Sequence, residues 1–146
     1  MYVDEPNQAI EAANGVRYAY RRCGPSGAPS LVLLSHFRGT LDSWDTALVD
    51  ALAVEHDVIA FDSAGVGLST GRACRTVRDL AADTLAFLEA LDVRRPDLLG
   101  AHSSEFSFVM KGAFTSCRSS ASISSRHKMI TCRSAWVGSG CVNSRP

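Results

Sequence analysis

Hydrophobic and polar positions alternate near the start of the chain, and the alternation predicts a strand. Val16, Tyr18 and Tyr20 are separated by polar or small residues, which is the period-two pattern of a strand with one buried face. An Asn-Gly pair at 14–15 comes before them and favours a tight hairpin turn. We therefore expect an earlier partner strand over residues 8–12.

Mostly apolar runs follow this hairpin, and they predict strands that are covered on both faces. The runs lie at residues 31–35, 57–61 and 97–100. Segments 44–56 and 76–92 lie between them and carry apolar residues at helical spacing. The order strand, helix, strand, helix, strand implies parallel strands joined by right-handed crossovers. The predicted fold class is therefore α/β, with a doubly wound and mostly parallel sheet.

Polar residues mark where the two helices are expected to begin. Ser43 is a candidate N-cap for the first helix. Thr76 and Asp79 have the spacing of a capping box at the start of the second, with Asp in place of the usual Glu or Gln. Two apolar stripes are expected to face the sheet: Trp44, Leu48, Ala51 and Leu52 in the first helix, and Val77, Leu80, Ala81, Leu85, Leu88 and Leu91 in the second.

The composition changes sharply after residue 100, and the change predicts two pieces. Residues 1–100 hold nine basic and fourteen acidic residues, with thirteen leucines and six serines. Residues 101–146 hold six basic residues and one acidic residue, with no leucine and twelve serines. A folded domain rarely changes its composition in mid-core. We expect an α/β domain portion over 1–100 and an irregular or disordered tail over 101–146.

Bulk properties exclude several classes of partner. The formal net charge is zero, so nothing global points to nucleic acid or a membrane surface. No run approaches the ~18 apolar residues that a bilayer span needs. The N-terminal residues lack the basic and apolar regions of a signal peptide. Five cysteines without compact spacing are typical of reduced thiols, so we expect a cytoplasmic location.

An apolar strand is expected to end at His36, and a glycine-containing loop leads from it to a helix with Trp44. A second strand ends in Phe-Asp at 61–62 and continues into the glycine-rich loop Gly-Val-Gly-Leu-Ser at 65–69. In this order, the motifs of residues 14–100 resemble the N-terminal third of an α/β-hydrolase, in the branch that includes bacterial esterases, haloperoxidase-like enzymes and epoxide hydrolases. The resemblance stops near Gly100, so the hydrolase-type sheet is expected to be incomplete, with a tail that does not match.

This resemblance implies the roles of a serine hydrolase acting on a small ester-like substrate, without a cofactor or metal. The backbone amide of Phe37 would be one oxyanion-hole donor. His36 and Gly39 would brace the loop that carries it, although His36 is equally read as a histidine satisfied at a strand end. Asp62 is expected to make a self-bonded turn of purely structural value. A phosphate-binding role for Gly65 and Gly67 is disfavoured, because no third glycine follows in phase.

The nucleophile of the resembled family belongs in a G-x-S-x-G turn directly after the strand at 97–100. With Gly100 as the first glycine, His102 occupies the position of the serine. An insertion of one residue makes Ser103 the nucleophile, but alanine then replaces the first glycine and Glu105 the last. Glu105 would bring bulk and negative charge beside a developing oxyanion. Two interpretations of Ser103 thus stay open: it is the catalytic nucleophile, or it is a plain surface serine without a catalytic role.

The remaining triad members are not recognisable. Residues 106–146 contain no Asp or Glu, and His127 is the only histidine among them. A serine hydroxyl without a base is a poor nucleophile. We therefore expect this chain to be a truncated and inactive member of the lineage, with residues after about 101 read in a shifted frame.

Other interpretations of the chain carry less weight. Cys117, Cys132, Cys141 and His127 lack the short cysteine pairs of a zinc site. The basic residues of the tail are scattered, which disfavours a polyanion-binding arm. A non-catalytic α/β module that binds a small ligand remains an alternative. The same module would self-associate through the strand at 97–100, whose far edge is expected to be open.

Overall fold

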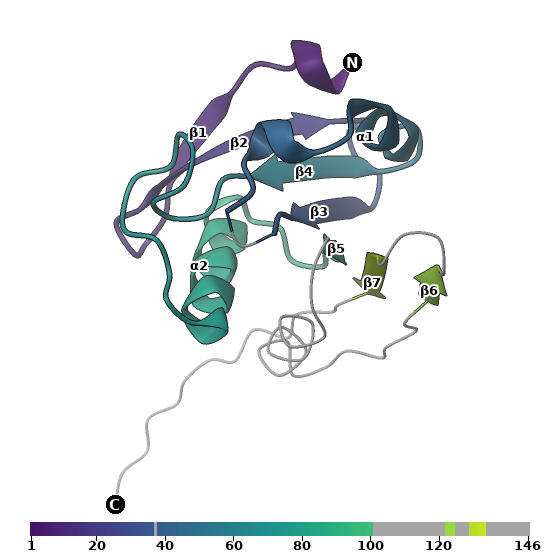
Figure 1. Ribbon diagram of the computed structural model, residues 1–146. Coiled ribbons are helices and arrows are strands. Elements are labelled where there is room, and N and C mark those ends of the chain that lie inside the picture. The colour runs from purple at the N-terminus through teal and green to yellow at the C-terminus, as the bar shows by residue number, and fades with distance from the viewer. Residues whose placement is uncertain (37, 101–121, 125–128, 134–146) are drawn as a thin grey trace, which may run out of the picture.

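The computed structural model describes residues 1–36, 38–100, 122–124 and 129–133 (Figure 1). The helical elements are η1 (Tyr2–Asp4), η2 (Leu41–Ser43), α1 (Thr46–Leu52) and α2 (Val77–Ala90). The strands are β1 (Gln8–Glu11), β2 (Arg17–Cys23), β3 (Ser30–Leu34), β4 (Asp57–Phe61), β5 (Asp97–Gly100), β6 (Ser122–Ser124) and β7 (Met129–Arg133).

The seven strands among the described residues form one mixed sheet in the order β1-β2-β4-β3-β5-β7-β6. The hairpin of β1 and β2 forms as predicted, with Gln8 opposite Tyr20. The three apolar runs form the parallel centre β4-β3-β5, and all other neighbouring strands are antiparallel. The predicted α/β class is confirmed, with parallel pairing confined to this centre.

Two hydrophobic cores cover the two faces of the sheet, because successive side chains of a strand point to opposite sides. Val32, Ile59 and Leu98 belong to the core beneath α2, and Phe87 is the largest residue that α2 itself adds to it. Leu31, Leu33, Val58, Ala60 and Leu99 belong to the other core, which Val49 of α1 and Tyr2 of η1 complete. The continuous apolar runs thus reflect burial on both faces.

The first helix begins later than predicted. Asp45 is the N-cap of α1, and its carboxylate accepts a hydrogen bond from the Ala47 amide at 2.9 Å. The prediction that Ser43 caps this helix is wrong, because Ser43 ends the separate turn η2, where its hydroxyl accepts a hydrogen bond from the Thr40 amide. Val49, which the predicted stripe omitted, is the buried residue of α1.

The second helix follows the prediction more closely. The Thr76 hydroxyl accepts a hydrogen bond from the Asp79 amide at 3.1 Å, which is one half of the expected capping box. The buried face is rotated from the predicted stripe and includes Thr84 and Phe87. Thr84 is accommodated there because its hydroxyl donates to the Leu80 carbonyl at 2.8 Å.

The far edge of β5 is not open, contrary to the prediction. β7 pairs with β5 in antiparallel register, with Leu98 opposite Cys132, so the backbone of β7 supplies partners to this edge. Two short strands therefore lie within the segment 101–146. The remaining residues of that segment lie outside the described part of the chain. Among the described residues, no helix is long and apolar enough to cross a membrane.

Candidate active site

The carboxyl ends of β3 and β5 lie side by side, at the point where the chain reverses its direction across the sheet. Leu34 pairs in register with Gly100, so the loop after β3 and the position after β5 start from adjacent places. The chain passes from β3 through α1 to β4, and then through α2 back across β3 to β5. In open α/β sheets such a reversal leaves a crevice outside the strand ends where ligands bind.

The loop over residues 35–40 contains His36 and Gly39, and we call it the oxyanion loop after the role that we expect of it from the sequence. The Gly39 amide donates to the His36 carbonyl at 2.8 Å. Gly39 is buried, and a Cβ atom there would lie 3.1 Å from the His36 ring and 3.0 Å from the Ser35 Cβ. The indole of Trp44 donates to the Ser35 hydroxyl at 3.0 Å and fixes the start of the loop.

The predicted site residues are only partly within the described chain. His36 is exposed, and its carbonyl accepts the hydrogen bond from the Gly39 amide described above. Phe37 and Ser103 both lie outside the described residues. The expected roles of all four therefore stay predictions.

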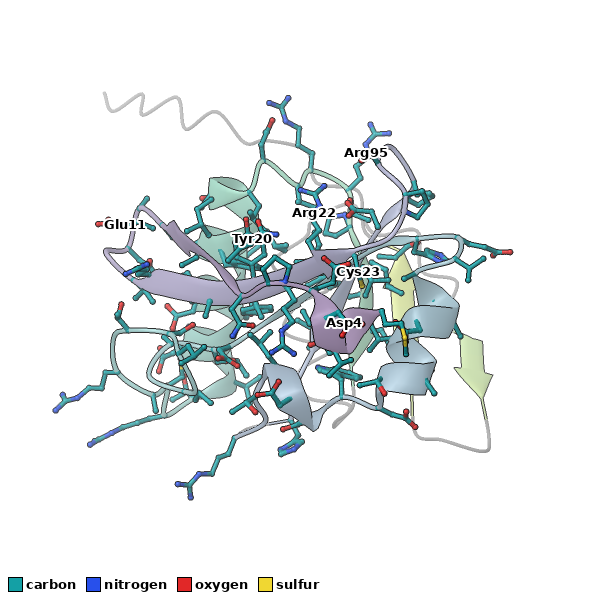
Figure 2. The ribbon with its side chains drawn as sticks, turned by 90° about the horizontal axis from the view of Figure 1, so that it is seen from above. Asp4, Glu11, Tyr20, Arg22, Cys23 and Arg95 are labelled. Atoms are coloured by element: carbon teal, nitrogen blue, oxygen red, sulfur yellow. The ribbon has the colours of Figure 1, made fainter. Side chains whose placement is uncertain are left out.

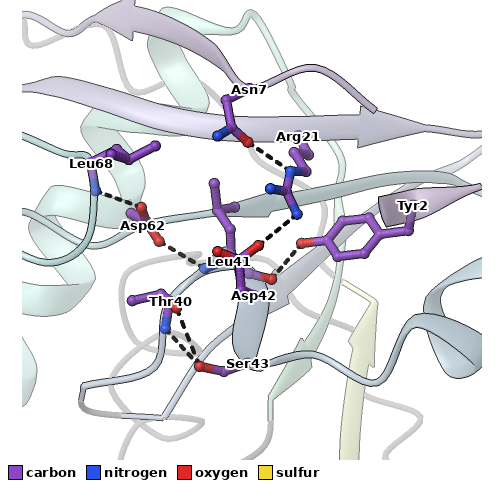
Figure 3. Close-up of polar contacts among 9 residues, drawn as sticks. All are labelled: Tyr2, Asn7, Arg21, Thr40, Leu41, Asp42, Ser43, Asp62 and Leu68. Carbon is purple, nitrogen blue, oxygen red and sulfur yellow. Dashed lines mark hydrogen bonds and ion pairs between the residues drawn. The ribbon is translucent and has the colours of Figure 1, made fainter. Parts of the chain in front are cut away.

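Asp62 joins this loop to the glycine-rich loop after β4. Its carboxylate is almost fully buried, and it accepts hydrogen bonds from the Leu41 and Leu68 amides, each at 2.8 Å (Figure 3). The bond to Leu68 is the self-bonded turn that the sequence predicted. The bond to Leu41 reaches another loop, so Asp62 also sets the far end of the oxyanion loop.

Ser69 completes the attachment of the glycine-rich loop to the sheet. Its buried hydroxyl donates to the Asp62 carbonyl at 2.7 Å and accepts from the Ala19 amide of β2 at 2.9 Å. The sequence identified Ser69 only as part of a family motif. Its bridging role depends on the β2–β4 pairing, which is a tertiary feature.

A side chain at position 67 would collide with the Asp62 carboxylate. Gly67 has φ +56°, and a Cβ there would lie within 3 Å of three carboxylate atoms. We expect Gly67→Ala to lower the free energy of unfolding by about 1–3 kcal/mol more than Gly15→Ala does. Gly15 has φ +76° with open space around it, so its substitution carries the backbone strain without the collision. Urea unfolding of both variants measures the difference, and equal losses would contradict this contact.

The backbone carbonyl of Leu41 accepts a hydrogen bond from a residue of the N-terminal segment. The Tyr2 hydroxyl donates to the Leu41 carbonyl at 2.7 Å, and burial raises the pKa of Tyr2 to about 12. Arg21 forms an ion pair with Asp42 at 2.8 Å and donates to Asn7 at 2.7 Å (Figure 3). Sequence reasoning missed this group, since no local pattern connects Tyr2 with Leu41 or Arg21 with Asp42.

Comparison with known proteins decides the family. A model of the family described as alpha/beta hydrolase fold matches residues 29–104, which is more than half of the chain. The chain belongs to the α/β-hydrolase family. The match runs from the start of β3 to just beyond β5, so it covers the oxyanion loop and the glycine-rich loop of this α/β-hydrolase.

The relatives span longer chains than this one. A protein of Pseudomonas savastanoi pv. phaseolicola, named "Putative carbamate hydrolase RutD", is 36% identical over 54% of this chain and 31% of its own. A solved α/β-hydrolase fold protein from Chitinophaga pinensis is 42% identical, with a TM-score of 0.65 over 68% of this chain and 36% of its own. A solved hydrolase from Pseudomonas aeruginosa is 34% identical, with a TM-score of 0.58 over 64% and 36%. The chain thus spans about a third of the length of these relatives.

Proposed function

We propose that the lineage of this α/β-hydrolase hydrolyses a small ester-like or related acyl substrate through a serine nucleophile and an oxyanion hole. The observation that carries the proposal is the register of Leu34 with Gly100, which starts the oxyanion loop and the nucleophile position from neighbouring strand ends. Preorganised backbone donors aimed at a developing oxyanion are often the largest electrostatic contribution to acyl transfer. The Phe37 amide is the donor we assign to this role, with His36 and Gly39 bracing the loop.

From the change of composition and the end of the family motifs near Gly100, we assign residues 1–100 to the N-terminal part of the hydrolase domain and residues 101–146 to a segment whose sequence does not continue those motifs, although its strand β7 pairs with β5. Ser103 is the nucleophile candidate that this segment offers. Residues 106–146 contain no carboxylate to orient a histidine base. We therefore propose that a polypeptide of these 146 residues does not complete the triad, and that residues from about 101 onward derive from a shifted reading frame.

Nucleotide sequence and a chemical probe together test this proposal. The codons around 95–150, read in all three frames, are expected to encode a small-x-Ser-x-Gly turn followed by acidic and histidine residues in one alternative frame. The corrected-frame protein is expected to react covalently with a fluorophosphonate at that serine, and its serine-to-alanine variant is not. An alternative frame without these residues would contradict the proposal.

The alternative is a non-catalytic module that binds a small ligand or forms a dimer. The pairing of β5 with β7 removes the open strand edge on which dimer formation rested. Ligand binding at the carboxyl ends of β3 and β5 would remain as the activity of such a module. A corrected-frame protein that resists the fluorophosphonate but binds a small ligand at these strand ends would favour the module.

A further inference from the structure

Both backbone polar groups of Leu41, its amide and its carbonyl, form hydrogen bonds with side chains distant in the sequence. The Leu41 amide donates to Asp62, and its carbonyl accepts from the Tyr2 hydroxyl, both within 2.8 Å. The Leu41 side chain is also buried, in the core that α1 covers. Leu41 directly follows the oxyanion loop, whose other end is fixed by β3. These contacts therefore fix the residue at which the oxyanion loop ends.

One of the two attachments comes from the N-terminal residues 1–7, which we call the strap. The Tyr2 ring is buried, and its amide donates to the Asp50 carboxylate of α1 at 2.6 Å. Arg21 of β2 lies over the Tyr2 ring, 5.3 Å from its centroid, and binds Asn7 of the strap and Asp42 of η2. Figures 1 and 2 show η1, with Asp4, next to α1.

We propose that the strap is a positioning element for the oxyanion loop, and that Tyr2 exerts this effect through the Leu41 carbonyl. An oxyanion hole works only when its donors are fixed in place before the reaction, so a displaced Leu41 peptide would weaken it. The catalytic meaning of the inference rests on the proposed function. The mechanical coupling of Tyr2 to the loop does not, and it is measurable without any turnover.

The test replaces Tyr2 with phenylalanine, which removes the hydroxyl and retains the buried ring. Hydrogen exchange at the Leu41 amide is expected to become about threefold to tenfold faster, the range that follows from losing one net hydrogen bond. The indole N–H resonance of Trp44 is expected to shift, because Trp44 donates to Ser35 at the start of the loop. Trp136→Phe in both proteins leaves Trp44 as the single indole signal, since the chain has two tryptophans.

Tyr20→Phe is the matched control. The Tyr20 hydroxyl donates to the Gln8 side chain at 2.9 Å, and its ring lies in the opposite core, beneath α2. Figure 2 shows Tyr20 on β2. This variant loses one tyrosine hydroxyl bond without touching the oxyanion loop. We expect it to leave the Leu41 exchange rate and the Trp44 resonance unchanged.

Two results would overturn the inference. The first is that Tyr2→Phe leaves both the Leu41 exchange rate and the Trp44 resonance unchanged. The second is that it accelerates exchange equally at Leu41 and at Val32 in the centre of β3, which would indicate a general loss of stability. Absence of fluorophosphonate labelling in the corrected-frame protein would instead count against the proposed function alone, because the exchange measurement needs no nucleophile.

Discussion

Replacing Asp62 with alanine is expected to lower the free energy of unfolding by about 3–6 kcal/mol. The buried carboxylate accepts two backbone hydrogen bonds, from Leu41 and Leu68. Hydrogen bonds to charged groups contribute about 1.5–3 kcal/mol each, and alanine leaves both amides without an acceptor. Typical domains have only ~5–15 kcal/mol of stability, so the loss is large. Urea unfolding followed by circular dichroism measures it.

Two further variants keep this experiment interpretable. Asp62→Asn retains one acceptor oxygen but turns an N–H₂ group toward the second amide, so we expect about half of the alanine effect. Asp45→Ala is the control, because the exposed Asp45 carboxylate accepts one backbone hydrogen bond as a helix cap. Its expected cost is about 0.5–2 kcal/mol. Equal losses for Asp62→Ala and Asp45→Ala would contradict a central role for Asp62.

Phe87→Ala is expected to destabilise the chain by about 3–5 kcal/mol. Phe87 is fully buried beneath the sheet, and its ring stacks on Phe61 with a centroid distance of 4.3 Å. Tyr18 and Tyr20 contact the same ring at 5.5 Å and 5.8 Å. Alanine leaves a cavity among these rings, and it removes the aromatic contacts that α2 makes with β4 and β2.

Two control variants accompany Phe87→Ala: Phe87→Leu retains most of the side-chain volume, and Leu68→Ala truncates an exposed leucine. Leucine at 87 retains most of the buried volume, so the expected loss is below about 1.5 kcal/mol. Leu68 is 65% exposed, so its truncation to alanine is expected to cost at most about 0.5 kcal/mol. A Phe87→Ala variant as stable as Leu68→Ala would show that the ring cluster is not packed as described.

The sequence predicted those elements that local pattern determines. The runs at 31–35, 57–61 and 97–100 correspond to strands β3, β4 and β5, because most of their side chains are apolar and are buried on one face or the other of the sheet. The Asn-Gly turn and the Thr76 cap are equally local signals. The start of α1 was missed because two polar candidates lie close together, and the turn η2 uses Ser43 before Asp45 caps the helix.

The candidate site was predicted only as far as family motifs reach. Asp62 was correctly expected to bond within its own loop, but its bond to Leu41 depends on how two loops meet above the sheet. Tyr2 had no local signal at all, because its role arises from contacts with residues of α1, β2 and η2. Such contacts join residues that are distant in the sequence, so the periodicity of hydrophobic residues does not predict them. The pairing of β5 with β7 was missed for the same reason.

Ester hydrolysis by the purified 146-residue chain tests the central claim most directly. That claim is the proposal made above, that these residues supply the oxyanion side of an α/β-hydrolase without completing its triad. With a p-nitrophenyl ester as substrate, we expect the chain and its Ser103→Ala variant to release nitrophenol at the same rate as buffer alone. Turnover above that background by the unaltered chain, abolished in Ser103→Ala, would contradict the claim.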